Sequence, residues 1–282
     1  LGDVEKIKFR DLASYNRTIN PGGKFNFTGI PFKLQLEDVN SKFVNLYMYI
    51  DTAGLTVRQQ KLLPLLLDVW MSSPLKKDGV VSDVGEVIKR VNKVLLKMSI
   101  SQGHSYLVIG AQMELDKLGL GLEFIRDRAY HSHFTIKELN TTITNRLHYK
   151  KPGATTILSN LFDGLYYGNS SSKHFTDHIK QKRFLEAMRE EVKINVNATI
   201  KEVHKLIALL MRPERVFMHL ATKAEELISL YSPGLTPLHS LFNTSAAPQS
   251  EEELGRRYEP LPESGYRKVE VAEGDLRHVA MG

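Results

Sequence analysis

The fold of this chain is decided by residues 31–75, PFKLQLEDVNSKFVNLYMYIDTAGLTVRQQKLLPLLLDVWMSSPL. Apolar and polar side chains alternate at 44–51, and this period of two predicts a strand with one buried face. Residues 31–37 are expected to form its hairpin partner, with the turn at 38–41. The segment therefore predicts an antiparallel strand pair at the start of a domain.

A leucine-rich helix is expected to follow this pair. Leucines crowd the stretch from Leu62 to Leu67, which indicates a helix with little exposed surface. Pro64 lacks a backbone N–H and is costly inside a helix, so we expect a short first turn and then a second segment that starts at Pro64. The side chains expected between the sheet and the later helices are Leu62, Leu63, Leu66 and Trp70.

The remaining pattern predicts a second hairpin and a block of helices. Alternating residues at 96–101, the turn QGH and the run SYLVIGAQMEL form the hairpin. Two capping boxes, Asp83 with Glu86 and Thr135 with Glu138, indicate where helices begin. Further elements are helices near 116–130, 135–150, 155–167 and 174–211, a strand in RVFMHLAT and a short helix in AEELISLY. We therefore predict the α+β class: a mainly antiparallel sheet with helices packed on one face.

Four segments differ in composition. Residues 1–29 are predicted to be a lead-in linker and 30–232 the α+β domain. Residues 233–266 are rich in Pro, Ser and Glu and are predicted to be a second linker. Residues 267–282 are interpreted as the first residues of a following domain, so the chain is expected to be a piece of something longer.

Composition narrows the classes of partner. The net charge of +6 arises from 38 basic and 32 acidic residues that are interleaved, which argues against a nucleic-acid partner. No apolar run approaches the roughly 18 residues of a membrane helix, so no membrane association is expected. The chain has no cysteine, which rules out thiolate zinc sites and favours a cytoplasmic location.

The segment HFTDH at 174–178 is the strongest metal candidate. His174 and His178 are four residues apart, so on a helix both imidazoles share a face and can reach one ion. Asp177 stands where the zinc motif H-x-x-E-H has glutamate, but its shorter side chain reaches less far toward a metal-bound water. Spacing alone nominates no third ligand, and we interpret both histidines as polar positions at the start of a helix.

Other candidates are weaker. His131 and His133 lie in a bend between two helices, where a histidine interacts favourably with a helix C-terminus. The run GLGLEF at 119–124 lacks the third glycine of a dinucleotide loop. Tyr47 and Tyr49 could touch a ligand, although aromatic residues in strands usually serve packing. No residue is therefore predicted to be catalytic, cofactor-binding or metal-binding.

Residues 30–232 resemble the third domain of pitrilysin-type (insulysin-like) zinc metallopeptidases, in a subgroup that includes large eukaryotic members. The features that carry the resemblance are Ser41 and Phe43 in the opening strand, the leucine-rich helix around Pro64, SSPL at 72–75, HYKKPG at 148–153 and QKRFLEAM at 181–188.

This resemblance implies four homologous domains around a closed chamber. The first domain of such enzymes carries H-x-x-E-H, which binds zinc and activates water, whereas the third keeps the fold without the motif and completes the chamber wall. The equivalent position here is about 56–72, and it contains neither histidine nor glutamate.

The expected function is that of a non-catalytic domain that shapes the chamber and contacts peptide substrates. The expected partners are those peptides and the other domains of the same parent chain. No cofactor is expected in this segment, and zinc is expected in the catalytic domain of the parent, a metalloendopeptidase. A free-standing scaffold or binding module with the same fold is the alternative, and a zinc enzyme that uses His174 and His178 is a third possibility.

Overall fold

The computed structural model describes residues 30, 32–103, 105–148, 178–231, 236–239 and 241–242, together with four positions between 156 and 162. The segments 1–29 and 267–282 and most of 233–266 lie outside the described residues, as does most of the helix expected at 155–167. Residues 236–242 lie in the stretch predicted as a linker, and there Leu238, Leu241 and Phe242 are buried.

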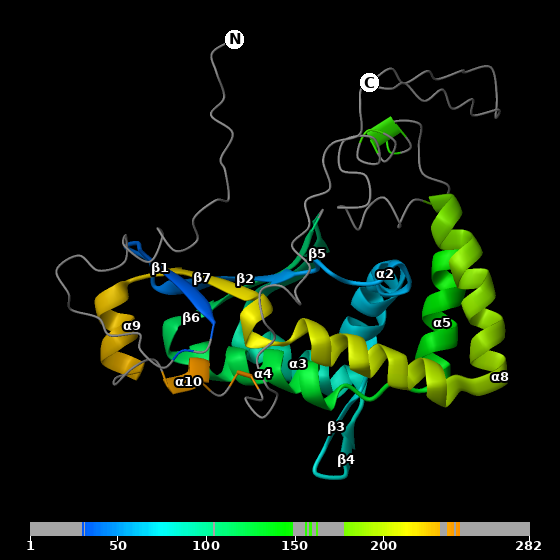
Figure 1. Cartoon of the computed structure of the whole chain (residues 1–282). Coiled ribbons are helices and arrows are strands. Elements are labelled where there is room, and N and C mark those ends of the chain that lie inside the picture. Colours follow the sequence, from blue (N-terminus) through cyan, green and yellow to red (C-terminus); the bar gives the residue numbers. More distant parts are fainter. Residues whose placement is uncertain are drawn as a thin grey trace, which may run out of the picture.

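A five-stranded sheet forms one layer of the molecule (Figure 1). Its strands, in spatial order, are β1 (Lys33–Asp38), β7 (Val216–Thr222), β2 (Phe43–Asp51), β6 (Tyr106–Glu114) and β5 (Leu95–Gln102). The β1–β7 pair is parallel, and the other three pairs are antiparallel. The α+β class and the mainly antiparallel sheet are therefore confirmed, and so is the second hairpin.

The predicted hairpin between 31–37 and 44–51 is wrong. β7 lies between the two strands and pairs with both, so that Leu220 faces Leu36 on one side and Leu46 on the other. Every second residue of β7 is buried, as in a strand packed on one face. A short link such as Val39–Lys42 can join adjacent strands or span one intervening strand, so local sequence does not distinguish these arrangements.

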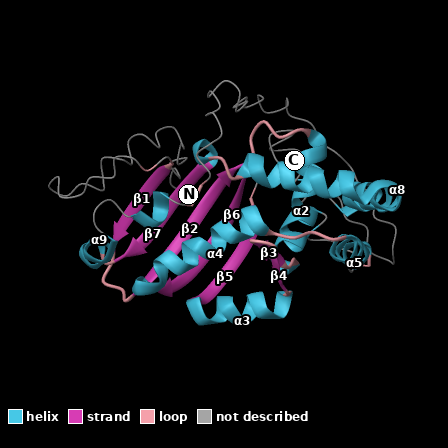
Figure 2. Ribbon diagram, turned by 90° about the horizontal axis from the view of Figure 1, so that it is seen from below, coloured by secondary structure: helices cyan, strands magenta, loops and turns pink. Residues whose placement is uncertain are grey.

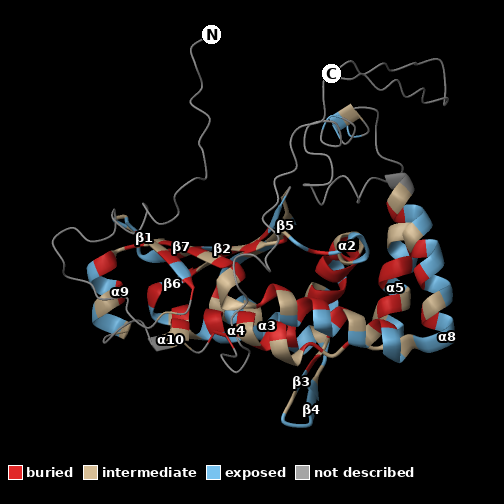
Figure 3. Cartoon of the chain, viewed as in Figure 1, coloured by how far each residue is buried: buried red, intermediate tan, exposed pale blue. Residues whose placement is uncertain are grey.

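Helices cover one face of the sheet, as Figure 2 shows for α3 and α4. The sheet side chains that face them are buried, with Leu46 and Met48 at 0% exposure, whereas Tyr47 on the opposite face is 42% exposed (Figure 3). The predicted capping boxes are present at the starts of α3 and α5. The helices are α2 (Val57–Ser72), α3 (Val84–Val94), α4 (Leu118–His131), α5 (Ile136–Leu147), α8 (His178–Leu210), α9 (Ala224–Tyr231) and α10 (Thr236–His239), with 3-10 turns at Leu115–Lys117 and Pro213–Arg215.

The helix α2 is continuous, so the predicted break at Pro64 is wrong. Pro64 sits inside the helix, and the residues around it are buried. The packing of this buried segment offsets the hydrogen bond that proline cannot donate. The prediction that Leu62, Leu63, Leu66 and Trp70 are buried is confirmed, because none of them is more than 1% exposed.

A small hairpin that sequence analysis did not predict projects beyond the helices (Figure 1). It consists of β3 (Leu75–Lys77) and β4 (Val80–Ser82). Asp78 and Gly79 form its turn with φ values of 52° and 80°. Both central residues thus have positive φ, the conformation that makes Asp-Gly a strong hairpin signal.

The long helix α8 bends sharply at Asn195, where φ is −153° and ψ is 83°. The Asn195 side chain accepts a hydrogen bond from the backbone N–H of Ala198, so it caps the second half of the helix. Figure 1 shows the first half standing beside α5 and the second half running below the sheet. An arginine of α2 spans the bend: Arg58 binds Glu191 before it at 2.7 Å and Glu202 after it at 2.6 Å.

Removing this bridge is expected to destabilise the chain in a pH-dependent manner. Arg58→Gln should lower the free energy of unfolding by about 1 kcal/mol at neutral pH, because the ion pairs are partly solvated. The Arg58 guanidinium lowers the pKa of Glu191 below its ordinary value of 4.5. This stabilisation is present above that value and disappears as the pH falls through the lower pKa of the folded state.

Urea unfolding at several pH values measures this effect. The difference between the wild type and Arg58→Gln should shrink below pH 4.5. The matched control is Arg189→Gln, since Arg189 pairs with the neighbouring Glu190 on the same side of the bend, at a longer distance of 3.7 Å. An Arg58→Gln effect that stays constant down to acid pH would show that the charge pairs do not carry the stabilisation.

Candidate binding surface

The face of the sheet opposite the helices presents a group of aromatic side chains. They come from the three central strands, and we call them the aromatic face: Tyr47, Tyr49, Tyr106, Phe217 and His219. Tyr47 is 42% exposed and Tyr106 is 37% exposed. In the described part of the chain, α3, α4 and the second half of α8 lie on the other side of the sheet (Figures 1 and 2).

The strand register brings these rings into contact. Tyr47 is directly opposite His219, and the two rings stack with centroids 6.3 Å apart. Tyr49 is opposite Phe217, and its ring lies 5.8 Å from that of Phe217 and 5.8 Å from that of Tyr106. Cross-strand aromatic pairs of this kind stabilise the sheet, so the row is fixed in place before any partner binds.

Hydrogen bonding and burial set the electrostatic character of the aromatic face. Glu37 on the neighbouring strand lies 3.0 Å from the His219 Nε2 atom and orients the imidazole. Burial, together with Tyr106 and Tyr47, raises the pKa of Tyr49, so its phenol stays neutral at physiological pH.

A glycine shapes the surface beneath Tyr47. Gly110 is opposite Tyr47 in the register, and a Cβ atom at Gly110 would lie only 3.4 Å from the Tyr47 ring. The same atom would be 2.8 Å from the Ser99 hydroxyl. The absence of a side chain thus lets the Tyr47 ring lie close to the sheet.

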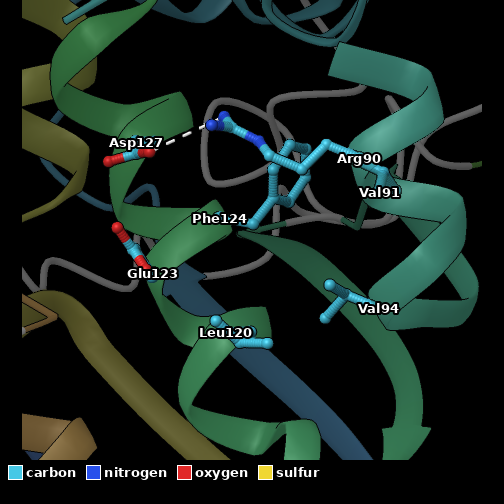
Figure 4. Close-up of a pocket in the computed structure, with 7 residues that line it drawn as sticks. All are labelled: Arg90, Val91, Val94, Leu120, Glu123, Phe124 and Asp127. Atoms are coloured by element: carbon cyan, nitrogen blue, oxygen red, sulfur yellow. Dashed lines mark ion pairs between the residues drawn. The ribbon is translucent and has the colours of Figure 1, made fainter. Parts of the chain in front are cut away.

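A hollow lies between α3 and α4 (Figure 4). Its apolar lining includes Phe124, and its polar edge includes Asp127. The Asp127 carboxylate lies 3.1 Å from Lys77 and 3.7 Å from Arg90, so its charge is balanced by neighbouring cations. These ion pairs connect the β3–β4 hairpin and α3 to α4, and we assign this hollow a structural role.

The metal candidate HFTDH lies almost entirely outside the described residues. His174 and Asp177 lie outside the described residues, and His178 is the first residue of α8. Across the residues that the structure describes, no three His, Asp or Glu side chains are grouped so as to hold a metal ion. No described helix is both long enough and apolar enough to cross a membrane.

Three further histidines, His131, His133 and His204, lie at or near the connection between α4 and α5. His131 is in the last turn of α4, where a cationic side chain is favoured. His204 of α8 lies over the ring of Phe134, with centroids 4.9 Å apart. Burial and the proximity of His133 lower the pKa of His204, so its imidazole is mainly neutral at physiological pH.

Comparison with known proteins identifies one sequence relative and several structures of the same fold. No protein-family model matches the sequence. An uncharacterized protein of Caenorhabditis elegans is 20% identical over 210 residues, which cover 72% of this chain and 21% of that protein. The chain thus spans about a fifth of this relative's length.

Three solved structures share the fold. A protease from Helicobacter pylori has a TM-score of 0.56 and 13% identity, and the match covers 78% of this chain and 51% of that one. The inactive domain of an M16 peptidase from Pseudomonas fluorescens gives 0.55 and 11%, with coverage of 78% and 51%. The periplasmic protease PqqL of Escherichia coli gives 0.51 and 10%, with coverage of 86% and 25%. The chain therefore has a pitrilysin-like (M16) peptidase-domain fold.

The amino-acid sequence alone indicates only part of the aromatic face. Tyr47 and Tyr49 were predicted to be packing residues or ligand contacts, and their alternation with buried residues indicated the outward direction correctly. Phe217 and His219 join them because β7 lies beside β2, which no local pattern revealed. The alternation of β7 was the available signal, since it predicted an outward-facing set without saying which neighbours it would meet.

Proposed function

We propose that this chain is a non-catalytic domain of a pitrilysin-type zinc metallopeptidase, where its sheet forms part of the chamber wall and contacts peptide substrates. The observation that carries the proposal is the aromatic face on a pitrilysin-like domain whose helices α3 and α4 lie on the opposite side of the sheet (Figure 2). A solvated sheet face is ordinarily polar, so exposed aromatic side chains there indicate a contact surface.

The helix α2 supports the non-catalytic role. It occupies the position that would carry the zinc motif in a catalytic domain, and its residues are VRQQKLLPLLLDVWMS. Its inward positions are used for packing, and its acidic residue, Asp68, pairs with Arg146 at 2.5 Å. Zinc and the water-activating glutamate would then belong to another domain of the parent protein.

The proposal predicts that the purified chain binds peptides without cleaving them and carries no stoichiometric zinc. A photoreactive peptide should cross-link to the sheet strands that bear Tyr47 and Tyr106 and should be recovered intact. Elemental analysis after dialysis and a fluorogenic peptide assay measure the other two properties.

A metal-dependent activity would contradict this function. About one zinc per chain, lost together with peptide cleavage in His174→Ala and His178→Ala, would make HFTDH an active site. Cross-linking confined to the helical side of the molecule would separate peptide contact from the aromatic face. The matched control is a peptide cross-linked to the Tyr47→Ser variant, where labelling of the sheet strands should fall.

A further inference from the structure

We infer that the aromatic face is a docking site for an extended peptide with aromatic or large apolar side chains at alternate positions. This inference rests on the proposed function and adds a class of peptide to it. Three properties of the face support it: its area, the placement of its charges and the spacing of its rings.

The area of the face suits a peptide better than a folded protein. Five strands about 4.8 Å apart, with strand lengths of seven to nine residues at β7 and β2, give a surface of about 600 Å². A stable complex of folded proteins buries about 800 Å² on each partner. An extended segment of about eight residues is as long as these strands, so it can lie along the row of rings from one end of the face to the other.

The charges of the face lie at its margin. Outward positions on the central strands β7, β2 and β6 near Tyr47 carry aromatic, amide or small side chains, including Asn45, Gly110 and Gln112. The carboxylates lie at the rim: Glu37 on the edge strand β1 pairs with His219 of the face, and Glu114 at the end of β6 pairs with Lys117. A ligand charge over Tyr47 and Tyr49 would lose water, and the Glu37 carboxylate beside them is already engaged by His219, so the face selects an uncharged segment.

The spacing of the rings matches an extended chain. Tyr47 and Tyr49 are two residues apart on one strand, so their side chains emerge about 7 Å apart. Alternate side chains of an extended peptide have the same repeat, which allows each to meet one ring. Tyr47 and Tyr106 are the more exposed rings and offer edges and faces to such side chains.

Binding of two labelled nonapeptides to the full chain tests this inference. One carries phenylalanine at alternate positions, and the other carries serine there, with equal length and no net charge. We expect the phenylalanine peptide to bind about tenfold more tightly by fluorescence anisotropy, and Tyr47→Ser to weaken it about tenfold. The matched control is Leu120→Ser on α4, because Leu120 is 54% exposed on the helical side.

Tyrosine nitration by tetranitromethane locates the bound peptide. Tyr47 and Tyr106 should react in the free chain and become protected by the phenylalanine peptide. Equal affinity for both peptides would overturn the aromatic preference and leave the wall function intact. No binding of either peptide would contradict both proposals. Failure of Tyr47 to react in the free chain would show that the face is already covered, and would overturn the docking site.

Discussion

Replacing Leu66 by alanine is expected to lower the free energy of unfolding by about 2–5 kcal/mol, the range for a filled core site. Leu66 is 1% exposed and lies in α2, whose buried side chains pack within the same core as the sheet. The change removes apolar contacts and leaves a cavity that close-packed neighbours cannot fill. Urea denaturation monitored by circular dichroism measures the loss.

The matched control is Val57→Ala at the start of the same helix. Val57 is 48% exposed, so the change should cost less than about 1 kcal/mol. Equal small effects at both positions would mean that α2 is not held against the sheet, and the two-layer arrangement would be wrong.

Replacing Arg128 by methionine is expected to destabilise the chain by about 3 kcal/mol or more. The Arg128 guanidinium donates to the backbone carbonyls of Trp70, Met71 and Ser73 at the end of α2, at distances of 3.1, 3.2 and 2.5 Å. Hydrogen bonds from a charged group contribute about 1.5–3 kcal/mol each, and buried carbonyls left without a donor are costly. Methionine retains the apolar stem but satisfies none of these acceptors.

Arg128 keeps its positive charge although its side chain is buried. Burial lowers its pKa to about 10, so the side chain remains protonated at neutral pH. Its positive charge also complements the dipole at the C-terminus of α2.

The matched control for this prediction is Arg126→Met, two residues earlier in α4. Arg126 approaches Glu123 at 3.7 Å on the surface, so its loss should cost less than about 1 kcal/mol. Thermal unfolding of both variants should separate them clearly. Similar midpoints would mean that solvent satisfies the end of α2 without Arg128.

The elements that sequence predicted well are those defined by neighbouring residues. Capping boxes at Asp83 and Thr135 fix helix starts through hydrogen bonds over three residues, and alternation at 44–51 fixes the buried face of β2. The Asp78–Gly79 turn has an equally local signal, because Asp-Gly favours positive φ at both turn positions. Local chemistry therefore accounts for the starts of α3 and α5 and for the orientation of β2.

Pairing between distant strands required the structure. The order β1-β7-β2 joins segments from the two ends of the domain, and each strand's pattern fits several neighbours equally well. The aromatic face depends on that order, since His219 reaches Tyr47 only across the β7–β2 pair. The interpretation of His174 and His178 as ordinary polar positions stays a prediction, because His174 lies outside the described residues.

The position of β7 also bears on how the domain acquires its structure. A chain synthesised only as far as Arg215 contains β1, β2, β5 and β6, yet β1 then has no partner among the described strands and β2 has one open edge. Completing the sheet means closing a loop from Lys33 to Phe217, and contacts so distant in sequence form slowly. Until then both edges are available to other nascent chains. Commitment of this domain to its native topology therefore occurs late, when nearly all of its residues have left the ribosome.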